Sequence, residues 1–357
     1  MTYDDLLAYD PYELQQDAKE RIFRELLSDL TDHHRKNCAA YDKACALLGD
    51  QTGTERTVET IPMVPVSLFK TLSLRSVPED EIFKTMTSSG TTGQQTSKIF
   101  LDRQTAAWQQ WTLERIVSSF IGPRRIPMLI IDSPNVLRDR NLFSARGAGI
   151  LGFSIFGARR RYALNERMEL DFQTIEQFIQ EAGDGPVLIF GFTYMIWKYF
   201  CQALRNAGRT LPLEHGILIH GGGWKKLQNE AVSAEEFRAG LRETCGLSIV
   251  RDYYGMAEQT GCIYMECECG HLHVSSYSDI LIRNMDDFSC CDNGTEGVIQ
   301  VLTPMAHSYP GHSILTEDKG IILGIDDCPC GRKGKYIRIT GRIPKAEVRG
   351  CSDTYEG

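Results

Sequence analysis

Short apolar runs alternate with longer amphipathic stretches through most of the chain. The runs are bounded by Gly, Pro or Asp, as buried strands of a parallel sheet usually are. The stretches between them, such as 104–120 and 170–180, carry apolar residues at helical spacing. Strands that alternate with helices predict an α/β protein with a mostly parallel sheet. The predicted strands are 128–131, 187–190, 217–220, 248–253 and 298–302.

The two ends of the chain show different patterns. Residues 11–37 carry apolar positions at helical spacing, which predicts an amphipathic helix packed on the body of the protein. From about Cys262 onward Gly, Cys and turn residues become frequent, which indicates a smaller β-rich unit. We therefore expect an N-terminal helical region at 1–75, an α/β core at 76–260, a β-rich subdomain at 261–342 and a short tail at 343–357.

The composition is that of an ordinary globular enzyme with room for two or three structural units in its 357 residues. A net charge of −8 argues against nucleic-acid binding, because no basic stripe can neutralise phosphates. No apolar run is long enough to span a bilayer, and the first residues lack the features of a signal peptide. We expect a cytoplasmic protein whose twelve cysteines are reduced and serve as ligands, nucleophiles or core residues.

A loop rich in glycine and hydroxyl groups is the first candidate for binding a phosphate. Its glycines allow a tight turn, and the exposed N–H groups and hydroxyls of such a turn form an anion-binding nest. It is not a Walker phosphate loop, because no lysine directly follows its second glycine. Alone, such a run is more often a solvated loop. The candidate residues are Ser88, Ser89, Gly90, Thr91, Thr92, Gly93 and, as a positive charge, Lys98.

Two further candidates follow predicted strands in the second half of the α/β core. Strand 217–220 runs into three glycines, where the backbone could touch a flat ring or a phosphate at the carboxyl edge of the sheet. The second candidate follows strand 248–253: the ring of Tyr253 or Tyr254 could stack on a purine, and Glu258 could hold Mg²⁺. For the first candidate the alternative is a turn that binds no ligand, and for the second it is a strand end at which Glu258 is solvated. Besides Glu258, the residues concerned are Gly221, Gly222, Gly223, Tyr253, Tyr254 and Gly255.

The last two candidates lie near the C-terminus. Asp318 could accept both hydroxyls of a ribose, although acidic turns are common. Arg342, after Gly341, could serve as a hinge residue and as a cation for a phosphate or a ribose. Each of these elements is weak by itself.

Together and in this order, the five elements resemble those of the adenylate-forming superfamily, which includes acyl-CoA synthetases and luciferases. The resemblance covers nearly the whole chain and implies a large domain of parallel-rich sheets flanked by helices, with a small β-rich subdomain. Tyr254-Gly-Met-Ala-Glu258 is similar to the Y-G-x-[ST]-E element of that superfamily. Ala257 departs from it and removes a hydroxyl expected near the α-phosphate or Mg²⁺. By the same resemblance Asp318 would bind ribose and Arg342 would be the hinge arginine.

Within the superfamily the chain most resembles the LuxE-like acyl-protein synthetases, with phenylacetate–CoA ligases as more distant relatives. This resemblance implies that ATP and a fatty acid form an acyl-adenylate, that Cys351 captures the acyl group, and that a reductase or acyltransferase subunit receives it. Arg349 and Arg342 could lower the pKa of the Cys351 thiol; a tail cysteine without a role is the alternative. The segments that carry the likeness are 61–70, 97–102, 220–227, 308–310 and 350–351.

The length of the tail bears on the choice of acceptor. CoA-forming relatives carry a C-terminal lid with a catalytic lysine, whereas only 15 residues follow Arg342 here (357 − 342) and Lys345 is their only lysine. We expect the lid to be largely absent or supplied by a partner, which favours an acyl-protein synthetase. An acyl- or aryl-CoA ligase and a weakened adenylate-binding subunit are the alternatives. Residues 190–197 could line an acyl tunnel, with core packing as the other interpretation.

Two C-x-C-G pairs suggest a structural metal site. In a reducing compartment such pairs are better explained by tetrahedral zinc than by disulfides. A glycine after each pair lets backbone N–H groups turn toward the sulfur atoms. Four reduced surface cysteines are the alternative, and Cys262, His271, His273 and the Cys290-Cys291 pair are substitute ligands. The predicted ligands are Cys267, Cys269, Cys328 and Cys330.

Overall fold

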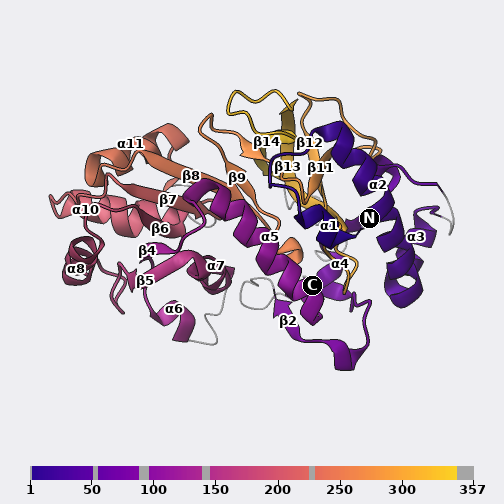
Figure 1. Ribbon diagram of the computed structural model, residues 1–357, viewed down its shortest axis with the longest axis horizontal. Coiled ribbons are helices and arrows are strands. Elements are labelled where there is room, and N and C mark those ends of the chain that lie inside the picture. The colour runs from indigo at the N-terminus through magenta and orange to yellow at the C-terminus, as the bar shows by residue number, and fades with distance from the viewer. Residues whose placement is uncertain (1, 51–54, 88–95, 139–144, 225–229, 344–357) are drawn as a thin grey trace, which may run out of the picture. The chain divides into compact units, whose positions relative to one another are not determined.

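The computed structural model describes residues 2–50, 55–87, 96–138, 145–224 and 230–343 (Figure 1). The described residues form two compact units. The first unit gathers those of 1–86, 97–106 and 273–357, and the second gathers those of 87–96 and 107–272. The units cut across the segments expected from the sequence, because chain ends far apart in sequence pack together in the first unit.

The second unit is built on a parallel sheet, as predicted. Its strand order is β5-β4-β6-β7-β8, and β9 pairs antiparallel with β8. Each predicted strand of this region is present and one or more residues longer at an end. The bounds are β4 Ile126–Ile131, β5 Gly157–Tyr162, β6 Val187–Phe192, β7 Gly216–Gly221, β8 Ile249–Tyr254 and β9 Tyr264–Glu266.

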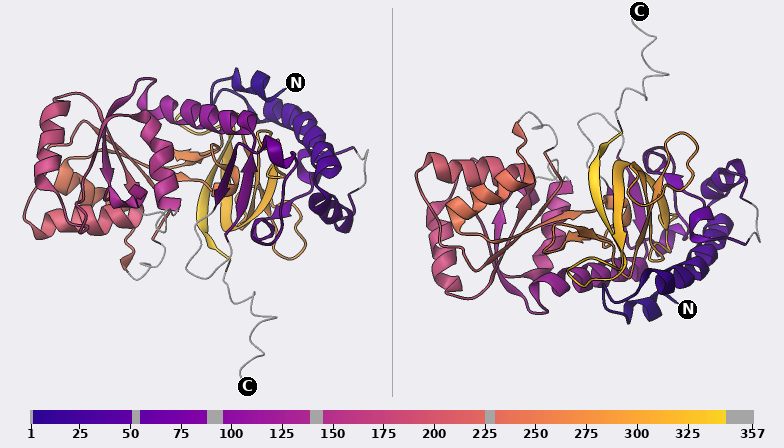
Figure 2. Two further views of the ribbon diagram at one scale, coloured as in Figure 1. Left: turned by 90° about the horizontal axis from the view of Figure 1, so that it is seen from below. Right: turned by 90° about the horizontal axis from the view of Figure 1, so that it is seen from above.

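Helices cover both faces of this parallel sheet (Figures 1 and 2). Ile189 of β6 faces a cluster with Phe178 and Phe237, which lie on two helices of one face. The next residue, Phe190, points to the other face and stacks on Phe153 of α7 with ring centroids 4.2 Å apart. This alternation is why the strands read as continuous apolar runs. The helices are α5 Arg103–Ile121, α6 Asn135–Arg138, α7 Ala145–Phe153, α8 Phe172–Ala182, α9 Thr193–Met195, α10 Gln202–Asn206 and α11 Ala234–Cys245.

The first unit contains an antiparallel sheet. Its strands run in the order β11-β12-β13-β14, and the short β1 (Val64–Pro65) adds in parallel to β13. Segment 298–302, expected among the alternating strands, is β12 of this antiparallel sheet. The bounds are β11 Asp279–Arg283, β12 Gly297–Leu302, β13 Ser313–Ile325 and β14 Lys335–Arg342; β2 (Lys84–Thr87) and β3 (Lys98–Leu101) form a separate pair.

The predicted N-terminal helix is α2 (Gln16–Asn37), and it contacts the antiparallel sheet through a buried charge cluster. Lys19 is fully buried on α2, with its Nζ 3.5 Å from a carboxylate oxygen of Asp279 on β11. Lys335 of β14 lies 3.1 Å from the other oxygen of the same carboxylate. Desolvation lowers the pKa of Lys19, while Asp279 opposes the shift. The short helices α1 (Tyr3–Leu7), α3 (Ala39–Leu47) and α4 (Leu68–Thr71) complete this unit.

None of the helices in the described ranges is both long and apolar enough to cross a bilayer.

Candidate functional site

The carboxyl edge of the parallel sheet holds the glycine run and the tyrosines predicted from the sequence. Strand register places Phe192 of β6 beside Gly221 of β7, and Gly221 beside Tyr253 of β8. A Cβ on Gly221 would lie 2.7 Å from the Tyr253 ring, so no larger residue fits. Gly222 and Gly223 follow with φ of 80° and 58°, the left-handed region that favours glycine. The three glycines therefore let the strand end in a sharp turn against an aromatic ring.

His220, directly before the glycines, is fixed by its neighbours. Its Nδ1 lies 3.0 Å from the hydroxyl of Thr193, and that hydroxyl also donates to the Gly221 carbonyl at 3.2 Å. Desolvation, with a contribution from Arg238, lowers the pKa of His220 to about 3. The imidazole is therefore neutral at physiological pH. His220 and Thr193 were not among the site residues predicted from the sequence; the signal available was their place at the ends of adjacent predicted strands.

Asp252 carries an unusual carboxyl group at the same edge. Desolvation and the carboxylate of Glu266 raise the pKa of Asp252 to about 7. Its side chain keeps 48% of its surface accessible. Its backbone N–H donates to Glu266 at 3.0 Å, and Glu266 also pairs with Arg238. The edge thus presents a partly protonated carboxyl group 3.6 Å from His220 Nδ1.

The two tyrosines of β8 have aromatic neighbours. The Tyr253 ring lies 5.1 Å from that of Phe153 and 6.5 Å from that of Phe190. The Tyr254 ring lies 5.8 Å from that of Tyr264. Both tyrosines are partly exposed. In segment 190–197, by contrast, Phe190, Phe192, Ile196 and Trp197 are buried in the core.

Glu258 follows β8 in a short 3₁₀ turn, Ala257–Gln259. Its side chain is buried, with 6% of its surface exposed. Gly255 lies in the connection between Tyr254 and this turn.

The first unit brings together two of the predicted residues, Asp318 of β13 and Arg342 of β14. They face each other in the strand register, and Arg342 Nε donates to Asp318 Oδ1 at 2.9 Å. The arginine side chain is 71% exposed and the aspartate 18% exposed. Lys98 begins β3 in the same unit with an exposed side chain, between the buried residues Ser97 and Ile99. The remaining candidates, Ser88, Ser89, Gly90, Thr91, Thr92, Gly93 and Cys351, lie outside the described residues.

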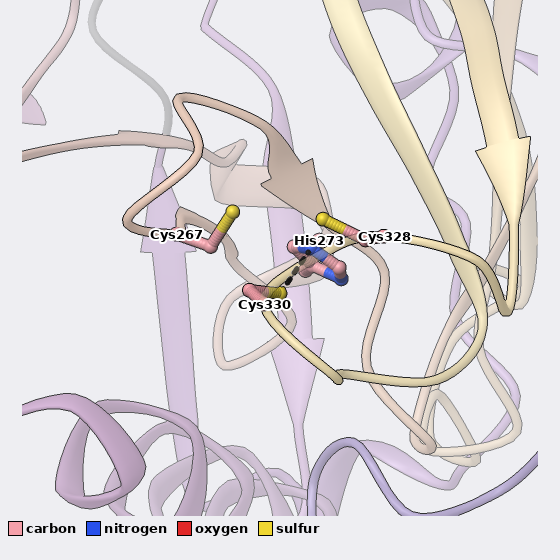
Figure 3. Close-up of side chains that lie close together, drawn as sticks. All are labelled: Cys267, His273, Cys328 and Cys330. Atoms are coloured by element: carbon pink, nitrogen blue, oxygen red, sulfur yellow. Dashed lines mark hydrogen bonds between the residues drawn. The ribbon is translucent and has the colours of Figure 1, made fainter.

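Three cysteines and a histidine form a compact cluster (Figure 3). The ligand atoms of Cys267, His273, Cys328 and Cys330 all lie within 4.8 Å of one another. His273 belongs to β10 (Leu272–His273), and its Nε2 lies 3.3 Å from Cys330 Sγ. The cluster differs from the predicted set in one member. Cys269 is exposed and stands outside it, and His273 takes the fourth place.

The backbone around the cluster explains the C-x-C-G pattern. Gly270 and Gly331 both have positive φ, 77° and 85°, and each donates its N–H to the carbonyl of the first cysteine of its pair. In the first turn the N–H of Cys269 donates to Cys267 Sγ at 3.3 Å. Cys269 thus contributes its backbone N–H to the cluster, as a hydrogen-bond donor to Cys267 Sγ, and not its side chain. Only the folded turn reveals this, because both cysteines look alike in sequence.

Known structures share this fold. The chain is similar in structure to 2-hydroxyisobutyryl-CoA ligase, solved in an open conformation with 2-HIB-AMP and CoA, with a TM-score of 0.70 and 16% sequence identity. The match covers 93% of this chain and 76% of the ligase. The predicted fold, that of the adenylate-forming ligases, is confirmed.

Sequence comparison identifies the family. Residues 2–356 match the acyl-protein synthetase, LuxE, family, and the chain belongs to it. It is 24% identical to the long-chain-fatty-acid–luciferin-component ligase of Vibrio harveyi over 98% of this chain and 91% of the relative. The ligase of the same name from Aliivibrio fischeri is 22% identical over 96% and 88%. The predicted family and ligase class are confirmed.

Proposed function

We propose that this protein uses ATP and Mg²⁺ to activate a fatty acid as its acyl-adenylate and then transfers the acyl group to Cys351. Membership of the acyl-protein synthetase family supports the reaction class. The observation that carries the proposal is the carboxyl edge of the parallel sheet, where the Tyr253 ring packs against the backbone of Gly221 and the chain then turns at Gly222 and Gly223. Ligands of open α/β sheets bind at this edge.

Several of the predicted residues have separate tasks in this reaction. Lys98 would bind the β- and γ-phosphates, since its exposed ammonium is a point charge at the start of β3. Glu258 would hold Mg²⁺, which when bound supplies positive charge to the phosphates. Asp318 would accept hydrogen bonds from the ribose hydroxyls, and Arg342 would orient the Asp318 carboxylate for this. Tyr253 and Tyr254 would contact the purine.

The chemistry proceeds in two displacements. A carboxylate oxygen bonds to the α-phosphorus of ATP as pyrophosphate leaves, which converts a poor acylating agent into a mixed anhydride. The Cys351 thiolate then attacks the carbonyl carbon, and AMP leaves with the electron pair of the broken C–O bond. Both reactants of the first step are anions, so positive potential and positioning account for most of the catalysis. A thiolate suits the second step because it is strongly nucleophilic.

The fate of the acyl group completes the proposal. A thioester on the protein is a carrier form, which we propose is consumed by an acyl-reductase or acyltransferase subunit. The cytoplasm suits this role, because thiols stay reduced there.

Self-acylation is tested with ATP, Mg²⁺ and labelled carboxylic acids, followed by denaturing electrophoresis. We expect label on the wild type and on the control variant Cys291→Ser, but not on Cys351→Ser, which should still release pyrophosphate. Label that leaves only as acyl-CoA when CoA is added would instead identify an acyl-CoA ligase. Pyrophosphate release should be lost in Glu258→Gln; if it is unchanged, the assignment of Glu258 is wrong.

We further propose that Cys267, His273, Cys328 and Cys330 bind a structural zinc ion. A tetrahedral site with Zn–S bonds of about 2.3 Å needs ligand atoms about 3.8 Å apart, which agrees with the 4.8 Å limit within which these atoms lie. Four protein ligands leave no open position, so the ion would be structural.

Metal analysis of the purified protein tests this site. We expect about one zinc per chain, as for a closed four-ligand site, retained in Cys269→Ser and lost in His273→Ala. Zinc retained in His273→Ala but lost in Cys269→Ser would restore the four-cysteine set predicted from the sequence.

A further inference from the structure

Three segments that carry the family likeness have no task in the proposed chemistry: 61–70, the part of 97–102 beyond Lys98, and 308–310. In the first unit they meet around the loop 303–312, which joins β12 to β13. Tyr309 of this loop is fully buried, and its ring packs edge-on against Phe69 at 6.3 Å. A Cβ on Gly311 would overlap the Tyr309 ring, so glycine is required there. The loop is therefore built to hold one conformation.

Ser308 links this loop to three other segments. Its hydroxyl donates to the carbonyl of Phe100 on β3 at 2.8 Å. Its N–H donates to the hydroxyl of Thr105, at the start of α5, at 3.3 Å. Its carbonyl accepts the N–H of Ser76 at 2.9 Å. Ser308 and Thr105 have no exposed surface, and Ser76 has 4%, so water does not replace these bonds easily.

His34 of α2 holds the other side of the same loop. Its Nε2 donates to the Ala306 carbonyl at 2.9 Å, and its Nδ1 accepts from the Ser76 hydroxyl at 2.7 Å. This pattern requires the neutral ring. Desolvation, with the neighbouring His312, holds the pKa of His34 well below its ordinary value.

Strand β3 depends on these contacts for its position. It has four residues, and in the described part of the chain it pairs only with β2. Ile99 and Leu101 anchor one of its faces in the core, and the Ser308 hydroxyl holds the carbonyl between them, that of Phe100. Lys98 is the first residue of the strand, two positions before Phe100. Movement of the Phe100 carbonyl would therefore displace the base of the Lys98 side chain.

We propose that Ser308, held in place by Ser76 and His34, is the positioning residue for Lys98. The inference rests on the proposed function, since it takes Lys98 to bind the phosphates of ATP. A lysine ammonium binds a phosphate well only when its backbone places the side chain at the right distance and in the right direction. The role is one of placement, because no group of Ser308 itself contacts ATP in this proposal.

A double-mutant cycle on ATP affinity, measured by calorimetry with MgATP, tests the inference. We expect Ser308→Ala to weaken ATP binding about tenfold, within the range that a misplaced group costs. In a Lys98→Ala background the same substitution should have no further effect, because the group that it positions is gone. Ser276→Ala is the matched control: its buried hydroxyl also donates to a backbone carbonyl, that of Asp10, at 2.8 Å, but does not contact β3.

The outcomes separate the two proposals. Equal losses from Ser308→Ala with and without Lys98, or an equal loss from Ser276→Ala, would overturn the positioning role and leave the role of Lys98 standing. ATP affinity unchanged in Lys98→Ala would overturn both. If Ser308→Ala does not fold, Ser76→Ala takes its place, because it removes only the hydrogen bond between the Ser76 hydroxyl and His34. It should give a smaller loss that also disappears in the Lys98→Ala background, and a loss that persists there would overturn the inference.

Discussion

The carboxyl edge of the second unit and the polar interior of the first unit place their candidate residues in different ways. At the edge, Phe192, Gly221 and Tyr253 come together through strand register, so the backbone decides the geometry. In the first unit, Lys98 depends on side-chain hydrogen bonds between segments far apart in sequence. Backbone placement tolerates most side-chain changes except at the glycines. Side-chain placement needs each buried polar group to keep its partner.

The largest effect should come from the buried charge cluster of the first unit. Asp279→Asn would remove the carboxylate that pairs with the buried Lys19 and Lys335, so we expect a loss of about 3–5 kcal/mol in the free energy of unfolding. Urea unfolding measures it. Asp286→Asn, at an exposed position nearby in sequence, is the matched control. A loss below that of the control would show that side-chain placement is not critical in this unit.

The next effect tests the backbone edge of the second unit. In Gly221→Ala the new Cβ would lie 2.7 Å from the Tyr253 ring and displace it. We expect pyrophosphate release to fall about 100-fold, as for a misplacement of about 1 Å at a reacting site. Gly185→Ala, where the new Cβ would make only an ordinary contact at 3.7 Å, is the matched control. Equal activity in the two variants would contradict the role of the Gly221–Tyr253 contact.

A smaller effect should appear on acidification of the first unit. Desolvation and Arg56 lower the pKa of His312 to about 3, and its Nε2 contacts Thr31 and Tyr41. In the unfolded chain His312 has an ordinary pKa of about 6.5, so between pH 6.5 and pH 3 the unfolded chain binds a proton there and the folded protein does not. The free energy of unfolding therefore falls as pH falls through this range, by about 1.4 kcal/mol per pH unit. Thermal unfolding from pH 7 to pH 5 should show a shallower dependence in His312→Gln than in the wild type and in the exposed-site control His215→Gln. Parallel pH dependences would exclude His312 as the source.

The smallest effect on stability should come from the Asp318–Arg342 pair. Because the arginine is 71% exposed, Arg342→Ala should cost less than about 1 kcal/mol in unfolding free energy. The same variant should weaken ATP binding, since Asp318 loses the group that orients it. Calorimetry and urea unfolding on one preparation separate the two. A large stability loss without a change in ATP affinity would make this pair structural.

The accuracy of the sequence-based predictions follows the same division. The parallel strands and α2 were predictable because apolar periodicity is local, and the glycine run because it directly follows a strand. Lys19 was not predictable as a buried residue, since its partners Asp279 and Lys335 lie more than 250 residues away (279 − 19 = 260). His273 looked equivalent to His271, and Cys269 to Cys267, until the turn directed the backbone N–H of Cys269 toward a sulfur atom.

The sequence alone determined the strand-helix alternation, the family, the glycines at the sheet edge and the two C-x-C-G turns, because each depends on neighbouring residues. Only the tertiary structure decided that His273 joins the cysteine cluster, that Asp318 pairs with Arg342, and that Ser308 and His34 hold the strand of Lys98. Those contacts join distant segments, and a side-chain hydrogen bond depends on distances of a few tenths of an ångström that no local pattern specifies.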